Sequence, residues 1–140
     1  MRSPIPMAKL NSYRELMVWQ KSMNLAERCY RMTRRFNRDD QLVLGHEIRK
    51  SCVSIPSNIA EGFDSRTKPM FVEFLGRAKA SAGELRAQTY VALDVGYLTD
   101  SESERLLDEI DKCSRQIGRL MAYVANDQKS ERANARTRER

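Results

Sequence analysis

The sequence predicts an all-α protein that folds as an antiparallel, up-down-up-down four-helix bundle. Three observations lead to this fold class. Apolar residues recur at alternating steps of three and four positions in four successive segments, which is the period of an amphipathic helix. No segment sustains the alternation of apolar and polar residues that is typical of a strand. Only a few residues connect one segment to the next, so successive helices are expected to lie antiparallel.

The first helix is expected to begin near Ser12, because Ser12 and Glu15 have the spacing of a capping box. It should end near Phe36. Apolar residues of this segment that are not part of the core stripe are expected to lie off the core face. The predicted core stripe consists of Leu16, Trp19, Met23, Ala26, Tyr30 and Thr33.

The second helix should follow Asp39 and Asp40, whose carboxylates favour a helix N-terminus, and should stop at Gly62. Pro56 lies inside it, where proline removes a backbone hydrogen bond. One interpretation is a kink that lets the bundle close, with neighbouring polar side chains satisfying the freed backbone groups. The other is a polar surface, formed by Asn58 and Glu61, that contacts a neighbouring subunit. The stripe of this helix is Leu44, Ile48, Cys52, Ile55 and Ile59.

The third helix should start near Thr67, because Pro69 is tolerated in a first turn. Gly83 in its middle costs about 1 kcal/mol relative to alanine, and we expect a close backbone approach to compensate. Gly96 followed by Tyr97 indicates a left-handed cap. The stripe is Phe71, Leu75, Ala78, Ala82, Leu85, Thr89 and Ala92.

The fourth helix is expected to begin at a capping box formed by Ser101 and Glu104. Apolar positions end near Asn126, which predicts disorder beyond it. The expected organisation is an N-terminal extension (1–12), the bundle (13–125) and a basic disordered tail (126–140). The stripe is Leu106, Ile110, Cys113, Ile117, Leu120 and Val124.

Features of membrane and secreted proteins are not found. No apolar run approaches the roughly 20 residues that span a bilayer. The first ten residues lack the apolar segment of a signal peptide. Cys29, Cys52 and Cys113 lie on apolar helix faces, where free cysteine behaves as a small hydrophobic residue. Buried, reduced thiols suit a reducing cytoplasm, so we expect a cytoplasmic protein with no membrane partner.

Patterns for catalysis and metal binding are also missing. The only histidine, His46, has neither Glu-x-x-His spacing nor an evident acidic partner. The cysteines show no CxxC spacing, and there is no glycine-rich phosphate loop. We therefore expect a protein that is not an enzyme and needs no metal or cofactor.

Positive charge gathers on the first helix, although the whole chain carries only +6. Residues 14–38 hold seven basic and two acidic residues, whereas 39–126 hold 11 basic and 14 acidic ones. Arginines along one helix face can bind consecutive phosphates without reading sequence. The alternative is a solvated basic face that only aids solubility. The predicted nucleic-acid-binding residues are Arg28, Arg31, Arg34, Arg35, Arg38, Arg49 and Lys50.

Two tyrosines lie close to these arginines in the sequence. Tyr13 and Tyr30 could stack on bases, although the position of Tyr30 in the apolar stripe favours the core.

The run Ser54-Ile55-Pro56-Ser57-Asn58-Ile59-Ala60-Glu61-Gly62 resembles the signature of the four-helix-bundle family encoded by intervening sequences in bacterial 23S ribosomal RNA genes. Leu16 to Lys21 resembles its opening helix, and Ile48-Arg49-Lys50 resembles the Ile-Arg-Arg before the signature. The third-helix residues and the Gly96-Tyr97 turn also fall in the family's order. Departures are mild: Glu47, Ser51 and Ala80 stand where the family often has Gln, Ala and Gly. The structural signature residues are Ser54, Pro56, Asn58, Glu61 and Gly62.

The resemblance implies a bundle that assembles as a homopentameric barrel. The chain is also similar to the accessory variability determinants of diversity-generating retroelements, which are basic pentamers that bind nucleic acid and associate with a reverse transcriptase. This implies nucleic acid, RNA or DNA, and a reverse transcriptase as partners.

A second functional class is a homo-oligomeric protein-interaction scaffold with no role in nucleic-acid binding. Its contacts would come from apolar residues that lie off the core stripes. These residues are Met17, Val18, Leu25, Met32, Phe63, Met70 and Val91.

Overall fold

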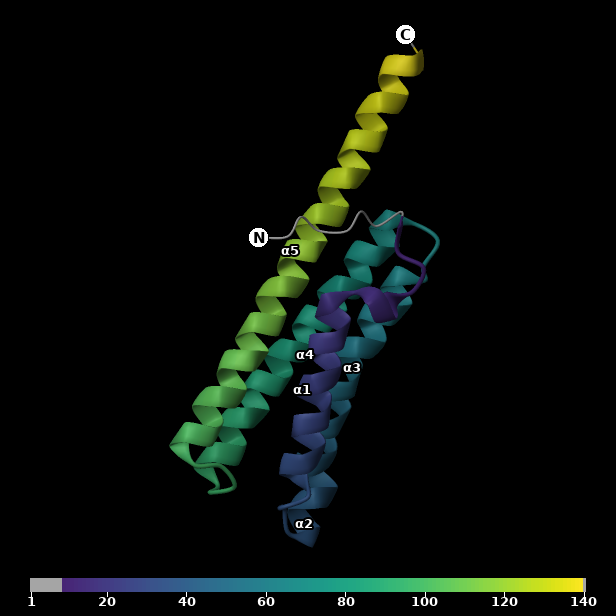
Figure 1. Ribbon diagram of the computed structural model, residues 1–140. Coiled ribbons are helices and arrows are strands. Elements are labelled where there is room, and N and C mark those ends of the chain that lie inside the picture. The colour runs from purple at the N-terminus through teal and green to yellow at the C-terminus, as the bar shows by residue number, and fades with distance from the viewer. Residues whose placement is uncertain (1–8, 140) are drawn as a thin grey trace.

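The computed structural model describes residues 9–139, which form helices and turns and contain no strand. This confirms the predicted all-α class. Four long helices make up the body: α1 (Met17–Thr33), α3 (His46–Phe63), α4 (Lys68–Asp94) and α5 (Asp100–Glu139). Figure 1 shows the chain running down α1, back along α3, down α4 and up α5. Short elements precede α1 (η2, Tyr13–Glu15) and α3 (α2, Arg38–Asp40; η3, Gln41–Gly45).

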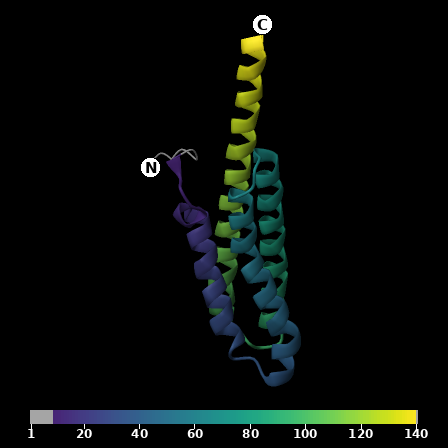
Figure 2. The same cartoon turned by 90° about the vertical axis from the view of Figure 1, so that its right-hand side faces the viewer.

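The helices do not contact one another equally. The most extensive interfaces join α3 to α4 and α4 to α5, while α1 packs mainly on α3 and has a much smaller interface with α5. Figures 1 and 2 show α1 separated from α5 along part of its length. At the base, Phe36 stacks on Tyr97 with ring centroids 4.1 Å apart. This contact joins the segment that follows α1 to the segment that precedes α5.

The core stripes predicted for three of the helices are confirmed. All seven predicted stripe residues of α4 are buried, as are Ile48, Cys52, Ile55 and Ile59 of α3. In α5 every predicted residue is buried except Leu120, which packs against the core. The three cysteines are free and buried, as predicted.

The stripe predicted for α1 was partly wrong. Tyr30 is 42% exposed, whereas Val18, Leu25 and Met32, which the sequence places off the core stripe, are buried. The segment carries two overlapping apolar stripes, and contact with α3 selects the one that includes Cys29. The expected intersubunit surface consequently loses three of its residues and keeps Met17, Met70 and Val91, which are exposed.

Two predicted helix N-caps were wrong. Ser12 accepts a hydrogen bond from the Arg14 amide and caps the short η2 turn, and α1 begins only at Met17. The capping box of α5 is formed by Thr99 and Glu102, not by Ser101 and Glu104. The Glu102 amide donates to Thr99 Oγ1 over 3.1 Å, and the Thr99 amide donates to Glu102 Oε1 over 3.3 Å. The sequence contains two overlapping capping-box motifs here, Thr99 with Glu102 and Ser101 with Glu104. Leu98 is buried in the core, and this places the start of the helix directly after it, at the earlier motif.

Other caps match their predictions. Thr67 Oγ1 accepts from the Met70 amide at the start of α4, with Pro69 in the first turn. Gly96 has a φ of +91°, the left-handed conformation that favours glycine at a helix C-terminus. Gly83 was predicted to lie against another backbone, but a Cβ atom at this position would meet nothing within 4 Å in the described chain. That expectation was wrong within the protomer.

Two of the signature residues, Ser54 and Gly62, contact α4. Pro56 is buried within α3, and the neighbouring Asn58 side chain donates to the Ser54 carbonyl and hydroxyl over 2.8 and 2.9 Å. The Ser54 hydroxyl in turn bonds the Ser81 hydroxyl of α4 over 2.8 Å. Glu61 is exposed. Asn58 thus stabilises the interior of the protomer.

Gly62 lets α4 approach α3 closely. A Cβ atom there would lie 2.9 Å from both Phe71 Cδ1 and Phe74 Cβ. Because real Cβ contacts are not so short, a larger residue would push the helices apart.

α5 extends beyond the point at which the sequence predicts disorder. It continues to Glu139, and its last turns project past the other helices (Figure 2). The side chains of these turns are exposed. No glycine or proline interrupts residues 119–139, and Lys68 at the start of α4 forms ion pairs with Asp127, over 2.7 Å, and with Glu131. Most of the predicted N-terminal extension (1–12) lies outside the described residues.

None of the described helices is both long enough and apolar enough to cross a membrane. Within residues 9–139, no group of three or more His, Cys, Asp or Glu side chains is placed to hold a metal ion.

Candidate nucleic-acid interface

Two of the predicted binding arginines are paired with acidic residues of α5. Arg28 forms an ion pair with Glu109, and Arg35 Nη1 lies 2.5 Å from Glu102 Oε2. The hydrogen bond from Arg35 and that from the Thr99 amide hold the pKa of Glu102 below its usual value. Arg28 therefore joins α1 to α5, Arg35 joins the turn after α1 to α5, and the charge of both is partly neutralised.

Three other predicted arginines have no acidic partner in the described part of the chain. Arg31 and Arg34, on the last two turns of α1 and its cap, and Arg38 of α2 are all exposed. Lys50 on α3 is likewise exposed. Because their charges face water, they are available to an anionic ligand.

Arg49 has a different environment from the other predicted residues. Its Nε donates to the Gly45 carbonyl over 3.1 Å, and Nη2 bonds both the Gln41 carbonyl and side-chain oxygen. Gln41 itself donates to the Thr33 carbonyl over 2.6 Å. Arg49 thus braces the π-helical turn η3, which the sequence did not predict, and its donors are directed into the protein.

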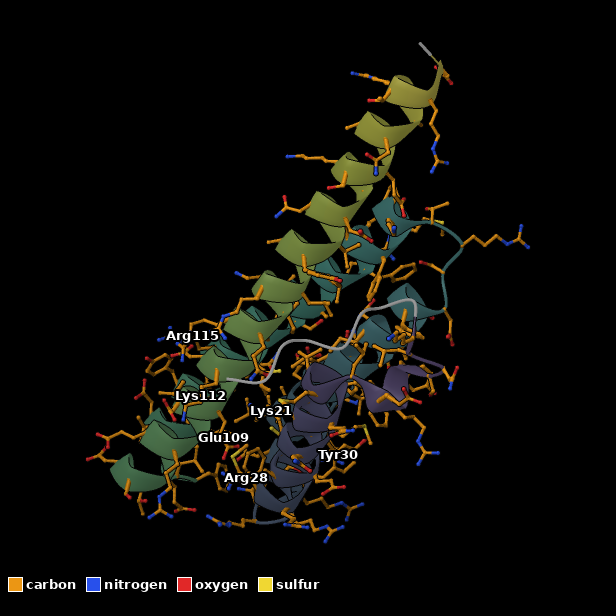
Figure 3. All side chains as sticks on the ribbon, turned by 45° about the horizontal axis from the view of Figure 1, so that its top comes forward. Lys21, Arg28, Tyr30, Glu109, Lys112 and Arg115 are labelled. Atoms are coloured by element: carbon orange, nitrogen blue, oxygen red, sulfur yellow. The ribbon has the colours of Figure 1, made fainter. Side chains whose placement is uncertain are left out.

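A basic groove of about 420 Å³ lies between α1 and α5. Figure 3 shows Lys21 and Arg28 on α1 close to Glu109 and Lys112 on α5. Lys112 is also paired with Asp108, one turn earlier on α5. The lining residues are Lys21, Asn24, Leu25, Glu27, Arg28, Arg31, Glu109, Lys112 and Cys113.

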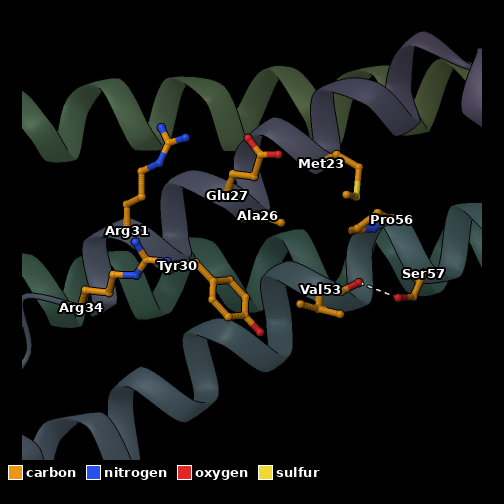
Figure 4. A pocket seen from close by; sticks show the side chains of 9 residues that line it. All are labelled: Met23, Ala26, Glu27, Tyr30, Arg31, Arg34, Val53, Pro56 and Ser57. Atoms are coloured by element: carbon orange, nitrogen blue, oxygen red, sulfur yellow. Dashed lines mark hydrogen bonds between the residues drawn. The ribbon is translucent and has the colours of Figure 1, made fainter.

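A second groove, of about 500 Å³, lies between α1 and α3. Figure 4 shows the Tyr30 ring reaching from α1 toward Val53 of α3, with Arg31 and Arg34 beside it on α1. The floor is mostly apolar. The lining residues are Met23, Ala26, Glu27, Tyr30, Arg31, Arg34, Val53, Pro56 and Ser57.

Arg31 lines both grooves, so a single ligand could contact the two of them across the α1 ridge. Together the grooves contain five basic residues (Lys21, Arg28, Arg31, Arg34, Lys112) and two acidic ones (Glu27, Glu109), a net of +3.

Sequence reasoning did not select Lys21 and Lys112 as binding residues. Lys21 lies in the basic segment, but nothing in its spacing separates it from other surface lysines. Lys112 comes from a distant helix that carries many acids, and only the packing of α5 brings it to the groove. No signal in the linear sequence indicates that placement.

The cysteines show no feature of a reactive site. Burial raises the pKa of Cys113 to about 11, and Cys29 has a raised pKa because it contacts Cys52 and is buried. The pKa of Cys52 is lowered, chiefly by its hydrogen bond with Cys29. All three side chains are buried, which limits their access to a substrate.

A family model described as 23S rRNA-intervening sequence protein matches residues 14–119. The chain belongs to this family. The match spans α1, α3, α4 and the first half of α5, and it includes both grooves. This confirms the resemblance that the Ser54–Gly62 signature indicates. The similarity to accessory variability determinants stays a prediction.

Among solved structures, this 23S rRNA-intervening sequence protein is similar to a protein of unknown function from the S23 ribosomal protein family of Bacteroides thetaiotaomicron. The TM-score is 0.70 at 21% identity, over 75% of this chain and 98% of that chain. This likeness supports the fold. No curated protein matches the sequence.

Proposed function

We propose that this 23S rRNA-intervening sequence protein is a non-catalytic helical bundle that binds nucleic acid, RNA or DNA, along α1. The observation that carries the proposal is the position of Arg31. It has no acidic partner in the described chain and borders both grooves, next to the equally unpaired Arg34.

The contacts would be electrostatic and independent of sequence. Exposed guanidinium groups neutralise phosphates and release condensed counterions, so affinity falls steeply as salt rises. The paired Arg28 and Arg35 would contribute less, because a phosphate must compete with Glu109 and Glu102. Arg31, Arg34, Arg38 and Lys50 then supply most of the binding energy.

The proposal includes assembly. We infer an up-down-up-down protomer that forms a cytoplasmic homopentamer, since five copies of a weak basic surface on one strand raise avidity without new contacts. By its resemblance to accessory variability determinants, the protein would act beside a reverse transcriptase.

The test is fluorescence anisotropy of labelled RNA and DNA, titrated with the purified protein at several salt concentrations. Wild-type protein should bind both, and log K should fall linearly with log salt. The double variant Arg31→Ala/Arg34→Ala should bind more weakly, with a slope smaller by about 1.4 to 1.8, because two phosphate contacts are lost. The matched control is Arg66→Ala/Arg105→Ala, which removes two exposed arginines outside α1.

A control that loses as much affinity as the α1 variant would show that only net charge matters. Failure of the wild-type protein to bind either polymer at low salt would remove the function altogether.

The second candidate function is a homo-oligomeric interaction scaffold. Leu42 and Val43 favour it, because these consecutive apolar side chains in η3 are 72% and 69% exposed. Light scattering separates the two questions: a pentamer of 16.2 kDa protomers has a mass of about 81 kDa. An oligomer that binds no nucleic acid would favour the scaffold, and a monomer would exclude the pentamer.

A further inference from the structure

The groove between α1 and α3 differs from a simple phosphate-binding surface because it holds an exposed aromatic ring. Tyr30 is 42% exposed, and its hydroxyl has no hydrogen-bond partner among residues 9–139. The sequence favours burial of this ring in the core, where it could not contact a ligand. The ring is instead accessible from the groove.

We propose that this groove binds a base of single-stranded nucleic acid, with the base stacked on Tyr30 and the adjoining phosphates on Arg31 and Arg34. This rests on the proposed function and adds to it a preference for single strands. Every base has a π-face, so stacking on an aromatic side chain next to a basic surface is a recognition mode that tolerates any sequence.

The groove has two chemically different ends. Its charged end carries Arg31 and Arg34, and its apolar end is formed by Met23 and Ala26 of α1 together with Pro56 of α3. A nucleotide has the same division between an anionic backbone and a flat, largely apolar base. The volume of about 500 Å³ is within the range of about 300–1,000 Å³ that is typical of small-ligand sites.

Glu27 lies on α1 between Met23 and Arg31. Figure 4 shows its carboxylate on the same side of α1 as Arg31, away from the Tyr30 ring, and it would repel a phosphate that moves from the arginines toward Met23. The phosphates are therefore directed to the Arg34 end, and the base lies toward Val53.

A duplex does not satisfy this arrangement. Its bases are stacked on one another and paired, so their faces cannot reach Tyr30 unless the duplex opens. A single strand offers unstacked bases at no such cost. The groove therefore binds a single strand more tightly than a duplex of the same sequence, even though the duplex carries more phosphate charge.

The experiment compares three variants on the full chain by anisotropy, with a labelled single-stranded RNA and its duplex. Tyr30→Ala should weaken single-strand binding by about 5- to 150-fold, the range for loss of one stacked base, and should change duplex binding little. Tyr30→Phe keeps the ring and should bind as wild type. Tyr123→Ala is the matched control, because Tyr123 is 41% exposed on α5 and lines neither groove.

A photocrosslink gives an independent readout. Single-stranded RNA carrying 5-iodouridine should crosslink to Tyr30 on irradiation, and mass spectrometry should find the modified peptide within α1. Circular dichroism of each variant verifies that helicity is retained.

The outcomes separate this inference from the function on which it rests. Suppose that wild-type protein binds both the single strand and the duplex, that Arg31→Ala/Arg34→Ala lowers both affinities, and that Tyr30→Ala changes neither. The stacking site is then wrong and the phosphate-binding surface stands. Equal loss with Tyr30→Phe and Tyr30→Ala would also overturn stacking. No binding by the wild-type protein would overturn both.

Discussion

The Arg35 guanidinium, in the turn that follows α1, lies 2.5 Å from the Glu102 carboxylate on α5, and these residues are 67 positions apart in the sequence. Arg28 of α1 and Glu109 of α5 repeat the arrangement further along. The two ion pairs divide the arginines of α1 into those that face α5 and are neutralised and those that remain available.

This division predicts that removing the acids strengthens nucleic-acid binding. The double variant Glu102→Gln/Glu109→Gln leaves Arg35 and Arg28 without partners, so both can contact phosphates. Anisotropy should show tighter binding and a salt slope larger by up to about 1.4 to 1.8. The control Glu73→Gln/Asp111→Asn removes two acids whose partners, Arg77 and Arg86, line neither groove. An equal gain in affinity with the control would mean that the lost negative charge, and not the release of Arg28 and Arg35, strengthens binding.

The same contact predicts a pH effect with a definite sign. The pKa of Glu102 is lowered in the folded protein, chiefly by the hydrogen bond from Arg35. The contact therefore stabilises the fold above the unfolded-state pKa and is lost as pH falls through the lower folded-state value. Carboxyl-carbon NMR titration should place the pKa of Glu102 below its usual value of 4.5, and Arg35→Ala should move the pKa back toward that value. An unchanged titration in Arg35→Ala would contradict the assigned cause.

Gly62 and Gly83 give opposite predictions for the same substitution. Gly62→Ala forces a Cβ against Phe71 and Phe74, and overpacking of this kind costs about 1–3 kcal/mol of unfolding free energy. Gly83→Ala meets nothing and should gain about 0.8–1 kcal/mol of helix propensity. Urea unfolding measures both. If Gly83→Ala leaves stability high but lowers the mass in light scattering, Gly83 lies against another subunit.

The residues that the sequence predicted well share one property. The stripes of α3, α4 and α5 each present a single apolar face, so periodicity alone determines which side is buried. In α1 two stripes compete, and only contact with α3 excludes Tyr30 from the core. Tyr30 was consequently expected to be buried, which is the reverse of what the proposed stacking site requires.

The binding residues were less predictable because their state depends on tertiary partners. Helical spacing placed Arg28, Arg31 and Arg35 on one face but could not indicate which would meet an acid of α5. Arg49 has the same side-chain chemistry as the others, yet the π-turn at Gln41–Gly45 uses its donors internally. Net charge identified the first helix as the basic one, but the packing of the helices determines which of its arginines are paired and which are exposed.

The start of α5 tests how a cap is chosen between two candidates. Thr99 and Glu102 exchange hydrogen bonds in the structure, while Ser101 lies exposed within the first turn of α5. Loss of an N-cap side chain costs typically about 1 kcal/mol, so Thr99→Ala should lower the unfolding free energy by that amount. Ser101→Ala should be neutral or slightly stabilising, because alanine is the better helix former. Urea denaturation of the two variants measures the difference. If Ser101→Ala lowers the unfolding free energy more than Thr99→Ala does, the N-cap is Ser101 and the helix begins two residues later. The Thr99 amide and Glu102 would then not be hydrogen-bonded to each other, and Glu102, the partner of Arg35, would be held less firmly.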